Sequence, residues 1–70
     1  MLKEGNVVLL SDNCKYMVLK SLKQDDIMFY FVFKATGDNK NFYIIKENGN
    51  NFEFVNDENI MIKFVKLMNS

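Results

Sequence analysis

The chain is 70 residues long, 49% of it hydrophobic, and its nine lysines balance nine acidic residues to give a formal net charge of zero. This length allows one small domain, and a single cysteine without any histidine excludes an internal disulfide bond and a cysteine–histidine zinc site. Zero net charge excludes a long-range positive field that would attract nucleic acid or an anionic membrane surface.

The first half of the chain predicts three strands separated by polar turns. Residues 7–10, 15–22 and 27–33 are the apolar or alternating segments. The residues between them, 11–13 and 23–26, are mostly short polar side chains, which favour turns because they bond to nearby backbone groups.

Residues 27–33 form the longest apolar run in the chain and predict a strand with two apolar faces. One face would carry Ile27, Phe29, Phe31 and Phe33, and the other Met28, Tyr30 and Val32. A strand of this kind belongs in the middle of a sheet, with a layer packed on each side.

The second half predicts two more strands. Residues 42–46 and 51–55 are joined through Asn48-Gly49, a dipeptide whose tolerance of positive φ suits a tight hairpin turn. Every connection between the predicted strands is too short for a parallel crossover, so the strands should form an antiparallel meander.

Beyond Val55 the apolar period becomes that of a helix. Asn56 is the expected N-cap, and Asp57 and Glu58 place negative charge in the first turn. The apolar positions fall within an arc of about 160° and are Ile60, Met61, Phe64, Val65, Leu67 and Met68. The helix should lie across the phenylalanine-rich face of residues 27–33.

These elements predict one α+β domain over residues 1–70. The expected fold is an antiparallel meander of about five strands, flat or curled into an SH3-like partial barrel, with one C-terminal amphipathic helix packed on it. The predicted core is Phe29, Phe31, Phe33, Ile44, Phe54, Ile60 and Phe64.

No set of residues predicts catalysis, a metal site or a cofactor site. Without histidine the usual general base near neutral pH is missing, and Cys14, beside Lys15 in a predicted turn, has no nameable base to activate it. Asp25 and Asp26 are interpreted as solvated turn residues. The loop oxygen donors match no calcium-binding spacing; they are Asp12, Asn13, Asp38 and Asn39.

Self-association is predicted from the second apolar face of residues 27–33. One helix covers one face of a sheet, so a homodimer would cover the other, and the candidate interface residues are Met28, Tyr30, Val32 and Tyr43. An edge strand is an alternative contact. The competing outcome is a sheet curled tightly enough to bury that face within one chain.

Three segments carry a family resemblance. They are residues 7–12 (VVLLSD), 15–19 (KYMVL) and 52–58 (FEFVNDE), in the order strand, acidic turn, Tyr-Val-Leu strand and, later, acidic entry to a final helix. The pattern resembles small uncharacterised Firmicutes proteins of the YrzB-like kind over most of the chain. The resemblance implies no activity, cofactor or functional residue.

The leading functional hypothesis is a small non-enzymatic module that binds an unknown protein partner, as an inhibitor or adaptor from a phage or mobile element, where short chains of this composition are common. One alternative is a small nucleic-acid-binding β-barrel, against which the zero net charge argues. Another is a self-associating accessory protein. With neither a signal-peptide pattern nor a membrane-length apolar segment, we expect a cytoplasmic protein with no membrane contact.

Overall fold

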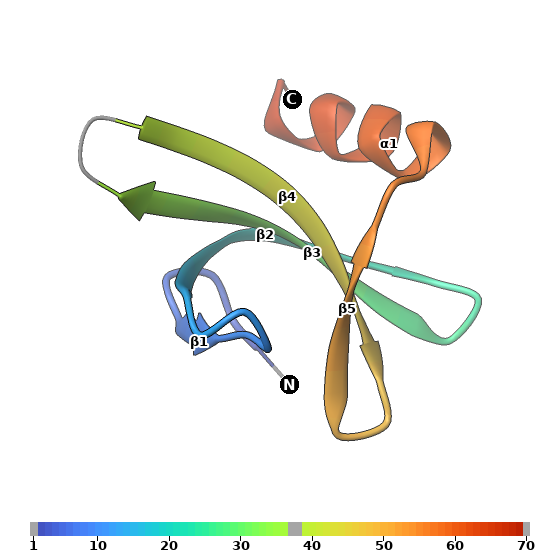
Figure 1. The fold of residues 1–70 in the computed structure, drawn as a ribbon. Helices are drawn as coiled ribbons and strands as arrows, with labels where there is room; N and C mark the ends of the chain where they lie inside the picture. The colour runs from blue at the N-terminus through green and yellow to red at the C-terminus, as the bar shows by residue number, and fades with distance from the viewer. Residues whose placement is uncertain (1, 37–38, 70) are drawn as a thin grey trace.

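The computed structural model describes residues 2–36 and 39–69, which form five strands and one helix. In chain order these are β1 (Val7–Leu9), β2 (Lys15–Gln24), β3 (Ile27–Thr36), β4 (Asn39–Asn48), β5 (Asn51–Val55) and α1 (Glu58–Met68). Each strand pairs antiparallel with the next, and α1 lies over one face of the curled sheet (Figure 1). The predicted α+β meander with one C-terminal helix is confirmed.

Strands β2, β3 and β4 have ten residues each and are longer than predicted. Polar residues at the ends of these strands continue the strand pairing; Gln24 at the end of β2, for example, pairs with Ile27 of β3. The connection between β3 and β4 is therefore shorter than the gap between the predicted strands 27–33 and 42–46, since residues 36, 39 and 40 lie in strands. Gly37 and Asp38 lie outside the described residues.

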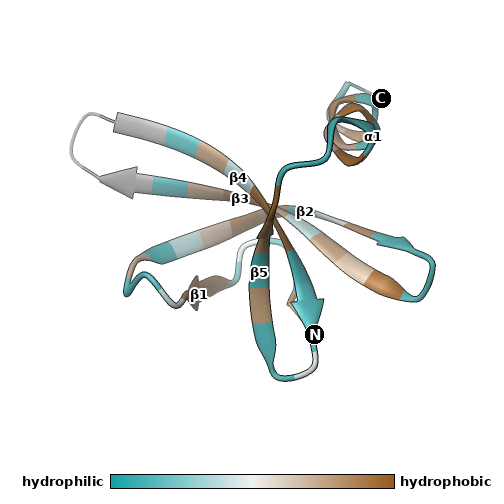
Figure 2. Cartoon of the chain, turned by 45° about the vertical axis from the view of Figure 1, so that its right-hand side comes forward, coloured by the Kyte–Doolittle hydropathy of each residue, from teal (hydrophilic) through white to brown (hydrophobic). Residues whose placement is uncertain are grey.

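Two of the predicted hairpin turns are confirmed by their backbone angles. Asp25 and Asp26 have φ of 54° and 63°, the left-handed region that both central residues of a type I′ turn require. Gly49, with φ of 63°, begins the two-residue loop between β4 and β5. The turns lie at the hydrophilic tips of the hairpins (Figure 2).

The helix packs on the phenylalanine-rich face of β3, as predicted. Its buried side chains, Ile60 and Phe64, form one core cluster with Phe29, Phe31 and Ile44. The Phe31 and Phe64 rings lie 5.8 Å apart, in a stacked arrangement. Phe29 and Phe31 share one face of the sheet because strand residues two apart point the same way, and Ile44 joins them because it pairs with Phe31.

Two residues of the predicted core need correction. Phe54 is 47% exposed because it pairs with Ile45, which places its side chain on the face away from the helix, at an edge strand. Phe33 is only half-buried. It pairs with Met17 and Phe42, both exposed, on a part of the sheet face that α1 leaves uncovered.

The opposite face of the sheet closes on itself. Curling of the sheet buries a second core cluster made of Leu10, Tyr16, Val18, Tyr30, Val32 and Ile45, with Leu2, Val8 and Phe52 packed against it. The register shift between Val18 and Lys20 supports the curl, because an irregularity of this kind increases local twist.

The expected dimer face is therefore buried within one chain. Tyr30 and Val32 are both 0% exposed and Met28 is half-buried, so these residues offer little or no surface to a second copy. The Tyr30 hydroxyl donates to Glu47 and accepts a hydrogen bond from the Leu2 N–H at 3.3 Å. The competing outcome, a sheet that closes this face internally, is the one found.

The helix begins one residue later than predicted. Asp57 is the N-cap, not Asn56, and its Oδ1 accepts hydrogen bonds from the N–H groups of Asn59 at 2.9 Å and Ile60 at 3.4 Å. A carboxylate at this position also interacts favourably with the helix dipole. Within the described part of the chain no helix has the length and apolar character needed to cross a membrane.

Candidate functional site

The helix has a second apolar side that the sheet does not cover. Met61, Val65 and Met68 are 42%, 48% and 47% exposed. At 100° per residue they fall within an arc of about 60°, roughly a quarter turn from the buried Ile60 and Phe64. The six apolar positions predicted for the helix therefore span more of its surface than the sheet contacts. Only two of them, Ile60 and Phe64, are buried.

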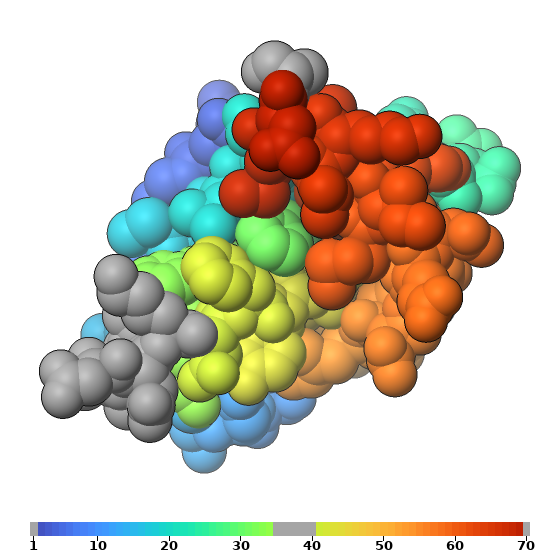
Figure 3. All heavy atoms as spheres, turned by 90° about the horizontal axis from the view of Figure 1, so that it is seen from above, coloured from blue at the N-terminus to red at the C-terminus, as the bar shows by residue number. Residues whose placement is uncertain are grey.

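A cavity of about 260 Å³ runs between this side of the helix and the sheet. It is lined by Phe31, Phe42, Val65, Met68 and Asn69. In the view from above, atoms of β3 (green) are visible between the helix (red) and β4 (yellow) (Figure 3).

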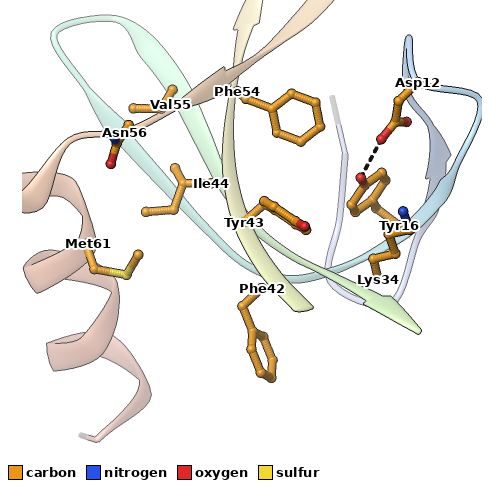
Figure 4. Close-up of a pocket in the computed structure, with 10 residues that line it drawn as sticks. All are labelled: Asp12, Tyr16, Lys34, Phe42, Tyr43, Ile44, Phe54, Val55, Asn56 and Met61. Carbon is orange, nitrogen blue, oxygen red and sulfur yellow. Dashed lines mark hydrogen bonds between the residues drawn. The ribbon is translucent and has the colours of Figure 1, made fainter. Parts of the chain in front are cut away.

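A larger cavity of about 500 Å³ adjoins the first, because Phe42 lines both. Its lining residues are Asp12, Tyr16, Lys34, Phe42, Tyr43, Ile44, Phe54, Val55, Asn56 and Met61. Figure 4 shows that β4 runs between two groups of these side chains: Ile44 and Met61 lie toward the helix, and Tyr43, Phe54 and Tyr16 lie on the other side. We call the helix-side surface the helix-flank groove; its residues are Phe31, Phe42, Ile44, Met61, Val65 and Met68.

Phe42 forms the centre of the helix-flank groove and is held by other rings. It stacks on Phe31 with centroids 5.5 Å apart and planes within 4° of parallel, and it lies 5.4 Å from Phe33. Even so, it is 50% exposed. Because neighbouring rings fix its position, a partner would not have to order this side chain on binding.

An aromatic cluster lies on the other side of β4. Tyr16, Tyr43 and Phe54 meet edge to face, with centroid distances of 5.7 Å, 5.9 Å and 5.6 Å for the three pairs. Tyr16 is buried, whereas Tyr43 and Phe54 are 37% and 47% exposed. The cluster therefore presents two rings to solvent and one to the core.

The charged groups beside the aromatic cluster are paired with their neighbours. Asp12 accepts a hydrogen bond from the Tyr16 hydroxyl at 2.6 Å and another from the Cys14 N–H at 3.0 Å. The Tyr16 hydroxyl lowers the pKa of Asp12, and burial together with the Asp12 carboxylate raises the pKa of Tyr16. The Cys14 sulfur and then Asp12 raise the pKa of Lys34.

Each of these shifts moves the pKa of its group further from neutral pH. Asp12 stays ionised, Tyr16 stays protonated and Lys34 stays charged, so none of the three is poised to exchange a proton near pH 7. Among the described residues no three His, Cys, Asp or Glu side chains gather in a way that could hold a metal ion. The arrangement is suited to holding an apolar group.

Of the four residues predicted to form an interface, the structure brings only Tyr43 to the candidate site. Met28, Tyr30 and Val32 belong to the buried side of the curled sheet. Sequence reasoning missed the groove. The signal that could have found it is the i, i+4, i+7 spacing of Met61, Val65 and Met68, which marks a separate side of the helix.

Comparisons with protein-family models, with curated proteins and with solved structures find no match. The fold and the site define the chain as a small α+β half-barrel with an exposed apolar groove beside its helix. The YrzB-like resemblance stays a prediction.

Proposed function

We propose that this chain is a non-enzymatic module that binds another protein through the helix-flank groove. The observation that carries the proposal is that four large apolar side chains, Phe42, Met61, Val65 and Met68, border two adjoining cavities while each is between 42% and 50% exposed. Contiguous exposed apolar surface of this kind marks interaction sites in soluble proteins.

The composition of the groove favours a protein partner. Phe and Met are enriched at protein interfaces, and Met adapts its flexible side chain to irregular partner surfaces. The smaller cavity has no charged side chain among its lining residues, so it offers no positive charge to a phosphate group. An apolar side chain from a partner is the ligand that fits these walls.

The role of inhibitor or adaptor, from a phage or mobile element, is part of this proposal and is supported by the size and composition of the chain. A homodimer would have to use other surface, such as the groove or a sheet edge, because the face first expected to form it is buried. The tests below therefore distinguish a foreign partner from a second copy.

A nucleic-acid-binding half-barrel is the second candidate function, and one observation favours it. Tyr43 and Phe54 are exposed close to Lys34, and exposed rings beside a cation can stack on unpaired bases. Titration of binding to single-stranded and double-stranded nucleic acid over a salt series tests this candidate, because phosphate contacts give a steep loss of affinity with salt.

The proposal is tested with two matched helix variants. Val65→Glu places a charge in the groove, whereas Ile62→Glu places the same charge on the same helix at a similar exposure, 51% against 48%, but lines neither cavity. Both variants should keep the wild-type circular dichroism spectrum because neither residue is buried.

In affinity capture from the native host, Val65→Glu should lose at least tenfold of the partner that wild type retains, a change of about 1.4 kcal/mol in binding free energy. Ile62→Glu should retain that partner. Equal recovery of the same proteins by both variants would remove the groove from the binding function.

A further inference from the structure

One edge of the sheet carries unpaired backbone groups. β5 pairs with β4 on one side and with no other strand in the described part of the chain. Asn48 and Asn51 flank a two-residue loop and so form a hydrogen-bonded pair, a pattern that repeats at every second residue. Phe52 and Phe54 fall between these positions, so their N–H and C=O groups point away from β4.

This edge faces a cavity of about 560 Å³. One wall is Asn50, Asn51, Phe52 and Glu53, and the other is Leu9, Leu10 and Ser11 at the end of β1. The Leu10 N–H donates to the Cys14 carbonyl at 3.1 Å, so by the same alternation Leu9 turns its backbone groups away from β2. The two edges of the sheet therefore both offer backbone hydrogen bonds at one cavity.

The β5 edge has few of the features that usually prevent strand addition. The chain has no proline, and β5 contains no lysine. Glu53, its one charged residue, is held toward β4 by an ion pair with Lys46 at 3.8 Å and a hydrogen bond from Asn48 at 2.6 Å. Proteins commonly protect sheet edges with lysine, proline or bulges. β1 has only three residues and is protected by its shortness.

We propose that an extended segment of another protein inserts between β5 and residues 9–11, antiparallel to β5. Its backbone would pair with Phe52 and Phe54 on one side and with Leu9 on the other. Alternate side chains of this segment would be apolar, because they meet Phe52 and Leu10 on the inner face of the sheet, and those between them would be polar, beside Asn51 and Ser11. This surface is separate from the helix-flank groove.

The geometry selects a free segment over a second folded copy. A strand that belongs to another folded sheet has a neighbouring strand about 4.8 Å away in the hydrogen-bonding direction. If such a strand paired with β5, its neighbour would need space on the side away from β5. That direction is occupied here by residues 9–11 of the same chain. The described residues of this chain already lie in the sheet, the helix and their connections, so none of them is free to supply the segment, and we assign it to a different protein.

The test uses short linear peptides selected from a random display library against the wild-type protein. In the free protein, amide hydrogen exchange should be fast at Phe52 and Phe54 and slower at Asn51 and Glu53. With a selected peptide at roughly 100 times its Kd, exchange at Phe52 and Phe54 should slow by about a hundredfold. Val65→Glu should bind these peptides as wild type does, which separates this surface from the groove.

A matched pair of variants tests the role of the Phe52 backbone N–H. Phe52→Ala and Phe52→Pro both lose the ring, but only Phe52→Pro loses the outward N–H, and an edge strand tolerates proline where the N–H faces solvent. Peptide binding should survive Phe52→Ala and be lost in Phe52→Pro. Failure to select any peptide, selected peptides that leave exchange at Phe52 and Phe54 unchanged, or protection of both amides by dimerisation without peptide would each overturn the proposal.

Discussion

Phe31 connects the core to the surface of the candidate site. Its ring stacks on Phe64 of the helix and on Phe42 of the helix-flank groove, while it is itself only 8% exposed. A small domain without a disulfide bond has a free energy of unfolding of roughly 3–5 kcal/mol. A single ring in this position therefore accounts for a large share of the stability.

Phe31→Ala should lower the free energy of unfolding by about 3–5 kcal/mol, because it removes a buried ring and leaves a cavity beneath the helix. Urea denaturation followed by circular dichroism measures the change. A variant whose urea midpoint nearly equals that of wild type would show that Phe31 is not at the centre of the core.

The buried tyrosines predict a loss of stability at high pH. Burial raises the pKa of both Tyr16 and Tyr30 above the ordinary value of 10.0, so the folded chain keeps protons that the unfolded chain releases. The stabilisation is fully present below pH 10 and is lost as pH rises, by at most about 1.4 kcal/mol per pH unit for each tyrosine.

Urea midpoints measured in steps from about pH 9 to pH 11 test this sign. Tyr16→Phe should show a shallower decline than wild type, since one of the two groups no longer titrates. A decline of equal slope in both proteins would mean that Tyr16 ionises as readily folded as unfolded.

At the scale of the elements, the start of the helix allows the stability effects of two adjacent residues, Asn56 and Asp57, to be compared. Asp57→Ala should cost about 1 kcal/mol because two N–H groups at the helix start lose their acceptor. Asn56→Ala should change stability by less than about 0.5 kcal/mol, since Asn56 is exposed and precedes the cap. Thermal unfolding of both variants checks the order, and a larger loss for Asn56→Ala would restore the sequence-based assignment.

The sequence predicts the elements well because local patterns determine them. The two-sided apolar run at residues 27–33 identifies the central strand, and the change of period after Val55 identifies the helix. The N-cap was assigned one residue early because Asn56 and Asp57 are both good caps, and only backbone geometry selects between them.

The exposure of individual residues could not be predicted from the same patterns. Alternation assigns a side chain to a face, but whether that face is covered depends on how far the sheet curls and how much of it the helix spans. Tyr30 was expected at an interface and is buried by the curl, whereas Phe54 was expected in the core and is exposed at the edge. The helix side of the groove is readable from the spacing of Met61, Val65 and Met68, but its sheet side depends on the curl and on how the helix sits, which the sequence patterns do not give.

At the scale of the whole molecule, both faces of the sheet have a core. One lies beneath α1 and the other inside the curl of the sheet. A second copy is therefore not required to bury either face. The apolar side chains that stay exposed lie on the helix, on the edge strands and on parts of the inner strands that neither core covers, and the helix-flank groove and the β5 edge are among these surfaces.

The most direct test of the proposed function is site-specific photo-crosslinking in the native host. A photoreactive amino acid at position 65 should give an adduct whose mass is that of this chain plus a different protein, and the same label at position 62 should give little or none. Position 62 is a suitable control because Ile62 and Val65 are exposed to a similar degree, 51% and 48%. Adducts of only twice the chain mass, or equal adducts from both positions, would contradict the proposal that the helix-flank groove binds another protein.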